Sequence, residues 1–150
     1  MKRARYGLAM DKTILDTDIL SEVLKGRNPQ VTACAEAYLA IHGVFTVSVV
    51  SVVEVVSGLQ RAERWEQLEQ FLQSLNAIEV IELDKESSVL AGRIDGDLWR
   101  TGQRIGRADP MIAAQAITHG LTLASGNTDH YARIQALGYP LRLVNWREGR

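Results

Sequence analysis

The sequence has little cysteine, little net charge and no long apolar run. A single cysteine, Cys34, excludes an internal disulfide and is typical of proteins from reducing compartments. The formal net charge of −1 gives no overall attraction to nucleic acids or membranes, so binding of either needs a local patch. No segment approaches the ~18 to 20 unbroken apolar residues of a membrane span. We therefore expect a cytoplasmic protein.

The composition is that of one soluble globular domain. Hydrophobic residues make up 46% and charged residues 23% of the 150 residues, a length that buries a real core. No internal repeat, linker or low-complexity tract divides the chain. The basic start, residues 1–9, lacks an apolar core of signal-peptide length and is expected to be a poorly ordered extension. The domain is then expected over residues 10–147.

Strand-like and helix-like patterns alternate along this domain. Strands are expected over about 12–16, 42–50, 77–83, 121–125 and 140–146. Helices are expected near 18–25, 29–41, 51–62, 65–75, 86–100 and 109–120. Asn28 followed by Pro29 is a strong helix start. The alternation predicts an α/β fold, a three-layer α/β/α sandwich with a mostly parallel central sheet.

The segment 51–62 is the ambiguous one, because its β-branched residues also suit a strand. Ser51 with Glu54 three residues later has the spacing of a capping box, in which each side chain bonds the backbone of the other residue. We therefore predict a helix that this pair caps.

Acidic residues gather where the predicted strands end. Asp16 and Asp18 follow the first strand, Asp109 opens a helix, and Asn127 and Asp129 follow the strand over 121–125. Ligands of open parallel sheets bind outside the carboxyl ends of the strands, so these groups are expected on one rim. Helix capping explains Asp18 and Asp109 equally well, and a turn explains Asp129. Only Asp16 has no local structural role.

Glu54, at the start of its helix, is expected on the same rim. Clustered carboxylates repel one another unless protons or a cation offset their charge. Oxygen ligands without cysteine or histidine in ligand spacing favour Mg²⁺ or Mn²⁺ over Zn²⁺. The acids therefore predict a divalent metal site.

Four segments, in order, carry a resemblance: "LDTDILSE", "SVVSVVEVVSGL", "IGRADPMIAAQAI" and "LTLASGNTDHYARI". Together they resemble PIN-domain ribonucleases, in particular the VapC-type toxins of bacterial toxin–antitoxin modules. The resemblance covers the chain from Met10 to about Trp146. It implies Mg²⁺- or Mn²⁺-dependent hydrolysis of RNA by a water nucleophile, inhibition by a cognate antitoxin, and a homodimer.

Carried over by this resemblance, Asp16, Glu54 and Asp109 are the metal carboxylates, and Asp18 lies at the substrate-facing rim. The fourth acidic position is open, because Asn127 takes its first place and Asp129 is shifted by one residue. The resemblance leaves open which of these two residues binds the metal.

Arginines precede Asp109 and suit phosphate binding. Arg104 and Arg107 flank the expected site and are expected to position the RNA, although a solvated surface explains them equally. Tyr131 is a candidate for stacking on a base, whereas Trp99 is expected to pack in the core.

Two other classes compete with the nuclease. "LDTDIL" also resembles the opening motif of haloacid-dehalogenase-like phosphatases, but those enzymes need a late lysine and the last lysine here is Lys85. The other class is a non-enzymatic metal-binding α/β domain. Apolar stripes over Trp65 to Leu75, and at Leu20 with Leu24, further predict a dimer surface and an antitoxin groove.

Overall fold

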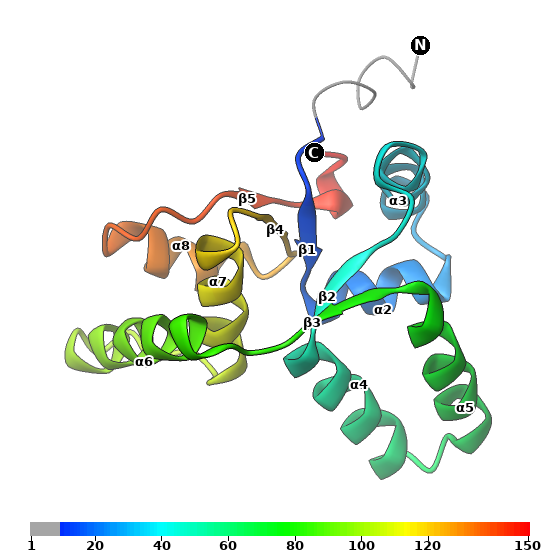
Figure 1. Cartoon of the computed structure of the whole chain (residues 1–150), viewed down its shortest axis with the longest axis horizontal. Helices are drawn as coiled ribbons and strands as arrows, with labels where there is room; N and C mark the ends of the chain where they lie inside the picture. Colours follow the sequence, from blue (N-terminus) through cyan, green and yellow to red (C-terminus); the bar gives the residue numbers. More distant parts are fainter. Residues whose placement is uncertain (1–9) are drawn as a thin grey trace.

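Five short parallel strands form the centre of the protein (Figure 1). The structure, a computed structural model, describes residues 10–150; the extension expected over 1–9 lies outside the described residues. The strands are β1 (Thr13–Leu15), β2 (Thr46–Ser48), β3 (Glu79–Ile81), β4 (Thr122–Ala124) and β5 (Leu143–Val144). They lie in the order β3-β2-β1-β4-β5, with every pairing parallel. The predicted parallel sheet is confirmed, with shorter strands than expected.

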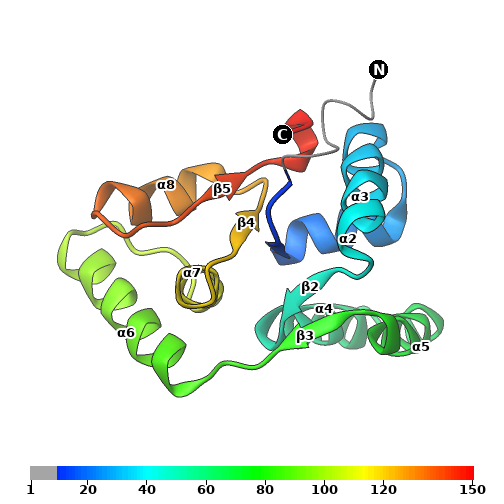
Figure 2. The same ribbon diagram turned by 45° about the horizontal axis from the view of Figure 1, so that its top comes forward.

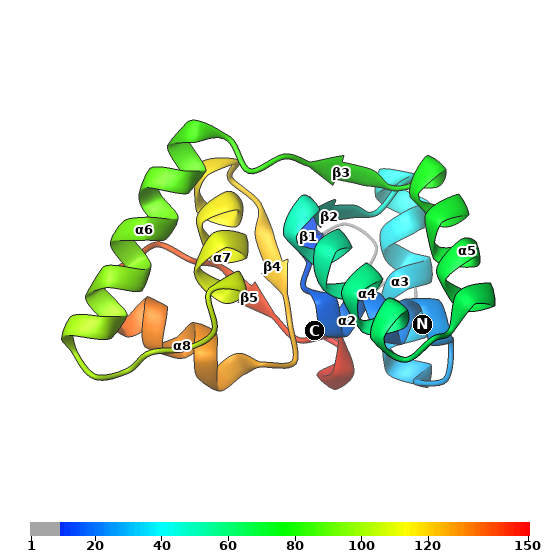
Figure 3. The same ribbon diagram turned by 90° about the horizontal axis from the view of Figure 1, so that it is seen from below.

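Helices cover both faces of this sheet. They are α2 (Thr17–Lys25), α3 (Pro29–His42), α4 (Val49–Arg61), α5 (Trp65–Ser74), α6 (Lys85–Arg100), α7 (Ala108–Thr118) and α8 (Thr128–Ala136), with 3₁₀ turns at Leu75–Ala77 and Trp146–Glu148. Figures 2 and 3 show α6, α7 and α8 gathered on one side of the sheet and α2, α3, α4 and α5 on the other. The three-layer α/β/α sandwich is therefore confirmed.

Alternating strand residues divide the core into two parts. Ile14 and Leu123 pack with buried residues of α6, α7 and α8. Leu15, Val47 and Ala124 point to the opposite face and pack with α2, α3 and the aromatic ring of Trp146. Successive side chains of a strand point to opposite faces, so Ile14 and Leu15 are both buried, one on each face of the sheet.

The strand order places a topological switch between β1 and β4. From β1 the chain adds β2 and β3 on one side, and then α6 and α7 carry it back to β4 on the other side of β1 (Figure 3). The connections that leave the carboxyl ends of β1 and β4 therefore diverge. This divergence opens a ligand position in parallel sheets of this kind.

Of two predicted helix caps, one is confirmed and the other is wrong. The Asn28 cap is confirmed, since its Oδ1 accepts from the backbone N–H groups of Gln30 and Val31. The capping box at Ser51 and Glu54 is wrong, because α4 begins at Val49 and Ser48, three residues before Ser51, caps it by accepting from Val50 N–H. Both residues of the expected box thus lie inside the helix, where their side chains are free for other contacts.

The helix α8 and the exposure of Trp99 were not expected. The residues after β4 predicted only a turn, yet Thr128–Ala136 is helical. Trp99 is 58% exposed, so its predicted core position is wrong. The inward face of α6 is occupied by Ala91, Ile94 and Leu98, which turn Trp99 outward. In the part of the chain from 10 to 150, no helix is long and apolar enough to cross a bilayer.

Candidate functional site

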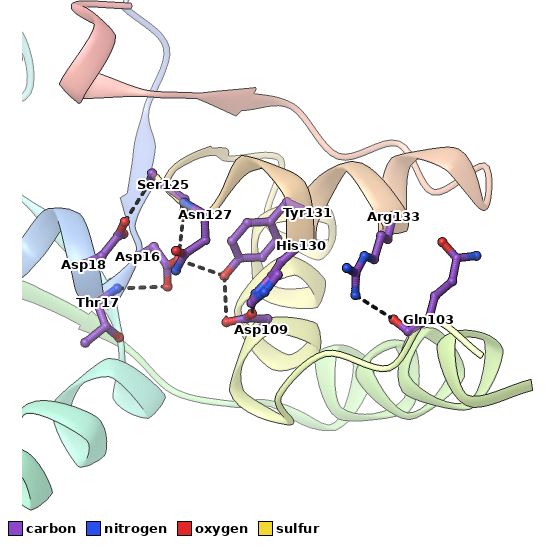
Figure 4. Close-up of polar contacts among 11 residues, drawn as sticks. Asp16, Thr17, Asp18, Gln103, Asp109, Ser125, Asn127, His130, Tyr131 and Arg133 are labelled. Atoms are coloured by element: carbon purple, nitrogen blue, oxygen red, sulfur yellow. Dashed lines mark hydrogen bonds and ion pairs between the residues drawn. The ribbon is translucent and has the colours of Figure 1, made fainter. Parts of the chain in front are cut away.

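Asp16 is a buried carboxylate at the end of β1, only 3% exposed. Its Oδ1 accepts a hydrogen bond from Thr17 N–H at 2.9 Å, which caps α2. Its Oδ2 accepts from the Ser125 hydroxyl at 2.7 Å and from the Tyr131 hydroxyl at 3.0 Å. Three donors from three segments therefore fix both oxygens of the side chain that local sequence left unexplained (Figure 4).

Asp109 meets the same tyrosine from α7. It lies in the first turn of that helix, after Arg107 at the helix start, so the alternative in which it caps the helix is wrong. Its Oδ1 is 3.3 Å from the Tyr131 hydroxyl and its Oδ2 is 2.9 Å from Nδ1 of His130. Figure 4 shows Asp16 and Asp109 on either side of the tyrosine hydroxyl.

Tyr131 supplies one proton between two carboxylates. Burial, and then the charges of Asp16 and Asp109, raise the pKa of Tyr131, so the hydroxyl keeps its proton and donates. A hydroxyl has a single proton, and the shorter distance is to Asp16. Asp109 Oδ1 then faces a hydroxyl oxygen without a proton between them. A cation near Asp109 relieves this arrangement.

The raised pKa of Asp16 also favours a cation at this place. The pKa of Asp16 is raised from 3.8 to about 6; burial is the largest cause, the charges of Asp18 and Asp109 also raise it, and the hydrogen bonds from Ser125 and Thr17 lower it. The ionised carboxylate is therefore costly in the folded protein. A proton or a bound cation removes that cost.

Glu54 reaches this edge through Thr17. Its Oε1 accepts from the Thr17 hydroxyl at 2.6 Å, and that hydroxyl lies 2.9 Å from the hydroxyl of buried Ser51. Thr17 follows Asp16 directly, so the exposed carboxylate of Glu54 is held beside the buried one. This contact is consistent with the prediction that Glu54 joins the rim, and it is a side-chain contact and not a cap.

Asp18 faces the loop after β4. Its Oδ2 accepts from Gly126 N–H at 2.9 Å and lies 3.5 Å from Nη2 of Arg147. Burial raises the pKa of Asp18, while the Gly126 hydrogen bond and the Arg147 charge lower it. A Cβ added at Gly126 meets Arg147 Nη1 at 2.3 Å, so a larger residue here would displace the end of the Arg147 side chain. Asp18 sits inside α2, whose cap is Asp16, so its predicted capping role is wrong.

The remaining predicted residues surround this group. Asn127 and Asp129 are exposed at the start of α8, and the backbone N–H of Asn127 donates to the Ser125 hydroxyl at 3.0 Å. Arg107 is exposed next to α7, and Arg104 stacks on Trp99. The structure thus joins Asp16 and Asp109 through the Tyr131 hydroxyl and leaves these four residues outside that arrangement.

The sequence did not predict that Ser125 and Tyr131 donate hydrogen bonds to Asp16. Tyr131 was expected to meet a base but is fully buried. The spacing of Tyr131, Ile134 and Leu137 is a helical stripe that could have identified α8 and turned the tyrosine inward. Ser125 directly follows β4 as Asp16 directly follows β1, and the paired strands bring both to one place.

The donor set suits a hard divalent cation with few protein ligands. Over residues 10–150, no three His, Cys, Asp or Glu side chains gather closely enough to form a complete site. Mg²⁺ is commonly held by one or two carboxylates with waters and substrate phosphates, so Asp16 and Asp109 fit this ion. The oxygen-only donors also fit Mn²⁺.

The raised pKa of Asp16 predicts a pH-dependent stability in metal-free buffer. The folded state binds the proton more tightly, so stability falls as pH rises from about 4 through about 6. Asp16→Asn should remove this loss and raise the free energy of unfolding by up to about 3 kcal/mol at about pH 8. Urea unfolding across this pH range measures the gap, which should close near about pH 4.

Asp129→Asn is the control, because it removes the same charge from an exposed position. Its unfolding free energy should follow that of the unchanged protein at every pH. A marked loss of stability in Asp16→Asn at high pH would instead make the carboxylate a structural requirement.

Comparison with known proteins identifies the family. The sequence matches the PIN domain over residues 13–137. The fold is similar to that of DNA-bound VapBC from Salmonella typhimurium, with TM-score 0.75 and 23% identity over 91% of this chain and 99% of that one. VapBC2 from Rickettsia felis bound to a promoter DNA fragment gives TM-score 0.74 and 25% identity, over 89% and 98%.

VapBC-1 from nontypeable Haemophilus influenzae gives TM-score 0.74 and 23% identity, over 89% of this chain and 97% of that one. No curated protein matches the sequence. The family match spans most of the chain and includes Asp16, Glu54 and Asp109. The chain therefore belongs to the PIN-domain family, whose members are nucleases.

Proposed function

We propose that this protein is a Mg²⁺- or Mn²⁺-dependent endoribonuclease that acts as the toxin of a toxin–antitoxin system in the cytoplasm. The observation that carries the proposal is the contact of buried Asp16 and partly exposed Asp109 with the Tyr131 hydroxyl, at the switch between β1 and β4. Family membership supports hydrolysis of a nucleic acid. Similar solved structures described as VapBC or toxin–antitoxin complexes support the toxin role.

Asp16 and Asp109 are the principal ligands of the proposed ion. Glu54, and Asn127 or Asp129, complete the site directly or through water. When bound, the ion supplies stabilisation of phosphoryl charge and a more acidic water molecule. A water nucleophile requires no covalent intermediate on serine or histidine.

The other residues hold these groups in place. Tyr131 keeps its proton and orients Asp16, while His130 orients Asp109 through Nδ1. Thr17 holds Glu54. Arg107 and Arg104 supply positive charge for the phosphates of RNA, and Asp18 holds the loop that bears Asn127.

The competing classes fit these contacts less well. A phosphatase that uses its first aspartate as a nucleophile needs that carboxylate to be accessible to substrate. Asp16 is 3% exposed and its oxygens accept three hydrogen bonds, so it suits a fixed ligand better. A metal-binding domain without catalysis is the alternative that activity measurements decide.

Removal of one charge from the site should abolish cleavage. Asp16→Asn, Asp109→Asn and Glu54→Gln each keep the shape of the side chain, and each should slow Mg²⁺-dependent cleavage of a fluorescent RNA by at least ~100-fold. Expression of the unchanged protein should arrest growth of a host that lacks the antitoxin, whereas the three variants should not.

Glu69→Gln is the matched control for Glu54→Gln, because it makes the same change at an exposed position on α5. Cleavage at the unchanged rate by Glu54→Gln, with the same Mg²⁺ dependence, would remove that residue from the site. The same result for Asp16→Asn would rule out the nuclease proposal itself.

A groove between α2, α4 and α5 is our proposed antitoxin site. It encloses about 420 Å³, and its lining includes the apolar side chains of Leu24, Leu59 and Phe71. Lys25, Arg27 and Arg64 also line it. We propose that an apolar segment of the antitoxin with acidic residues occupies this groove, because its charge complements the three cations.

Leu24→Glu tests the groove without touching the nuclease site. Leu24 is 47% exposed, so the fold should tolerate the change, while a buried charge opposite the antitoxin should weaken inhibition by at least ~tenfold. Titration of ribonuclease activity with the cognate antitoxin measures this. Val53→Glu, at a position 64% exposed on α4, is the control. Equal inhibition of both variants would place the antitoxin elsewhere.

We also propose a homodimer, with a correction to its predicted surface. Leu20 is fully buried and is not part of any surface, whereas Trp65 and Leu72 of α5 are 51% and 42% exposed. Exposed apolar side chains of this size favour association with another chain. Light scattering at tens of micromolar should give twice the monomer mass, and a monomer mass throughout would contradict the dimer.

A further inference from the structure

Trp99 and Arg104 form an exposed stacked pair at the end of α6. The guanidinium carbon of Arg104 lies 4.3 Å from the centroid of the indole ring. Trp99 itself is 58% exposed. The proposed hydrolysis gives Trp99 no role and uses Arg104 only as positive charge for the phosphates of RNA. The pair therefore offers a flat surface with positive charge at a place where a buried aromatic was expected.

Positive charge is concentrated around this pair. Residues 99–107 contain Arg100, Arg104 and Arg107 and no acidic residue, although the whole chain carries a net charge of −1. Arg100 pairs with Asp97 at 3.1 Å, whereas Arg104 and Arg107 are exposed. A ligand that carries phosphates therefore binds more favourably at this segment than at the acidic parts of the protein surface.

The segment is tied to the body of the protein and leads to the aspartates. Gln103 N–H donates to the carbonyl of Leu98 at 2.8 Å, Arg133 Nη1 lies 3.5 Å from the Gln103 carbonyl, and Ile105 is buried. Figure 4 shows Gln103 beside Arg133 of α8, and the chain continues from Gln103 to Asp109. The five steps along the chain from Arg104 to Asp109 span at most ~18 Å.

We propose that the Trp99–Arg104 pair stacks on a base of single-stranded RNA, outside the phosphodiester that is cleaved. The inference rests on the proposed ribonuclease function and adds a substrate contact to it. Aromatic and guanidinium planes stack on unpaired bases, and neighbouring arginines bind the phosphates between them. A duplex keeps its bases stacked on one another, so the pair selects single strands with little preference for sequence.

RNA fits this surface better than a partner protein. Tryptophan and arginine also recur in protein interfaces, so the choice rests on the charge of the segment: residues 99–107 contain three arginines and no acidic residue, which suits the repeated phosphates of RNA. The planar faces of a base and an indole match, and the backbone phosphates of RNA neutralise the arginines.

Binding in the absence of metal tests the pair separately from cleavage. Full-length Asp16→Asn protein in EDTA keeps the RNA intact, and fluorescence anisotropy measures its affinity for single-stranded RNA of about 16 nucleotides. Adding Trp99→Ala should weaken binding about tenfold, while Trp99→Phe, which still stacks, should retain most of the affinity. Arg104→Gln should weaken binding and reduce the slope of log affinity against log salt by about one.

Val89→Ala is the control, because Val89 is 52% exposed on the same helix, α6, and belongs to none of the proposed sites. Its affinity for RNA should be unchanged, with the oligomeric state of every variant checked by light scattering. Trp99→Ala alone, in the active protein, should raise KM for the long RNA and leave cleavage of a dinucleotide unchanged.

The outcomes separate this inference from the proposed function. Binding that depends on Trp99, without any cleavage by the active protein, would keep the stacking contact and overturn the ribonuclease proposal. If the active protein cleaves RNA and Trp99→Ala leaves the RNA affinity unchanged, the stacking contact alone would be overturned. Absence of RNA binding, or loss of dimer or antitoxin binding in Trp99→Ala with RNA affinity intact, would also overturn it.

Discussion

A carboxylate buried at the end of a parallel strand must receive hydrogen bonds, because burial without them costs several kcal/mol. Asp16 receives them from Thr17 at the start of α2, Ser125 at the end of β4 and Tyr131 of α8. Each donor belongs to a different segment, and the Ser125 and Tyr131 contacts span more than a hundred residues of sequence. The position of Asp16 thus ties together β4, α2 and α8, and Tyr131 extends the arrangement to Asp109.

A second contact secures the same loop from the other side. Asp18 accepts from Gly126 N–H, and Arg147 near the carboxyl end of the chain lies against both residues. The side chain of Arg147 occupies the space that a Cβ at position 126 needs. Asp18 therefore holds the loop between β4 and α8 through Gly126, and Asp16 holds it through Ser125. As a result, Ser125 and Asn127 have fixed positions relative to β1.

The sequence predicted what depends on local pattern. Buried strands read as apolar runs, and Asn28 with Pro29 marks a helix start, so the alternating fold was accessible. The hydrogen bond from Ser125 to Asp16 joins residues 109 apart, which no local pattern encodes. The wrong capping box at Ser51 arose because Ser48, three residues earlier, offers the same chemistry at a position that the sheet selects.

The acidic residues differ in exposure, and this difference determines what each can do. Asp16 is enclosed by donors and keeps one orientation, which suits a group that fixes the place of a cation. Glu54 is exposed and held by a single hydroxyl, so its carboxylate can turn at low cost toward a cation or a water between them. Tyr131 retains its proton, so proton transfer during hydrolysis falls to the carboxylates and to water. In the proposed site, a rigid buried acid beside an exposed one held by a single hydrogen bond would combine fixed binding with adjustable proton transfer.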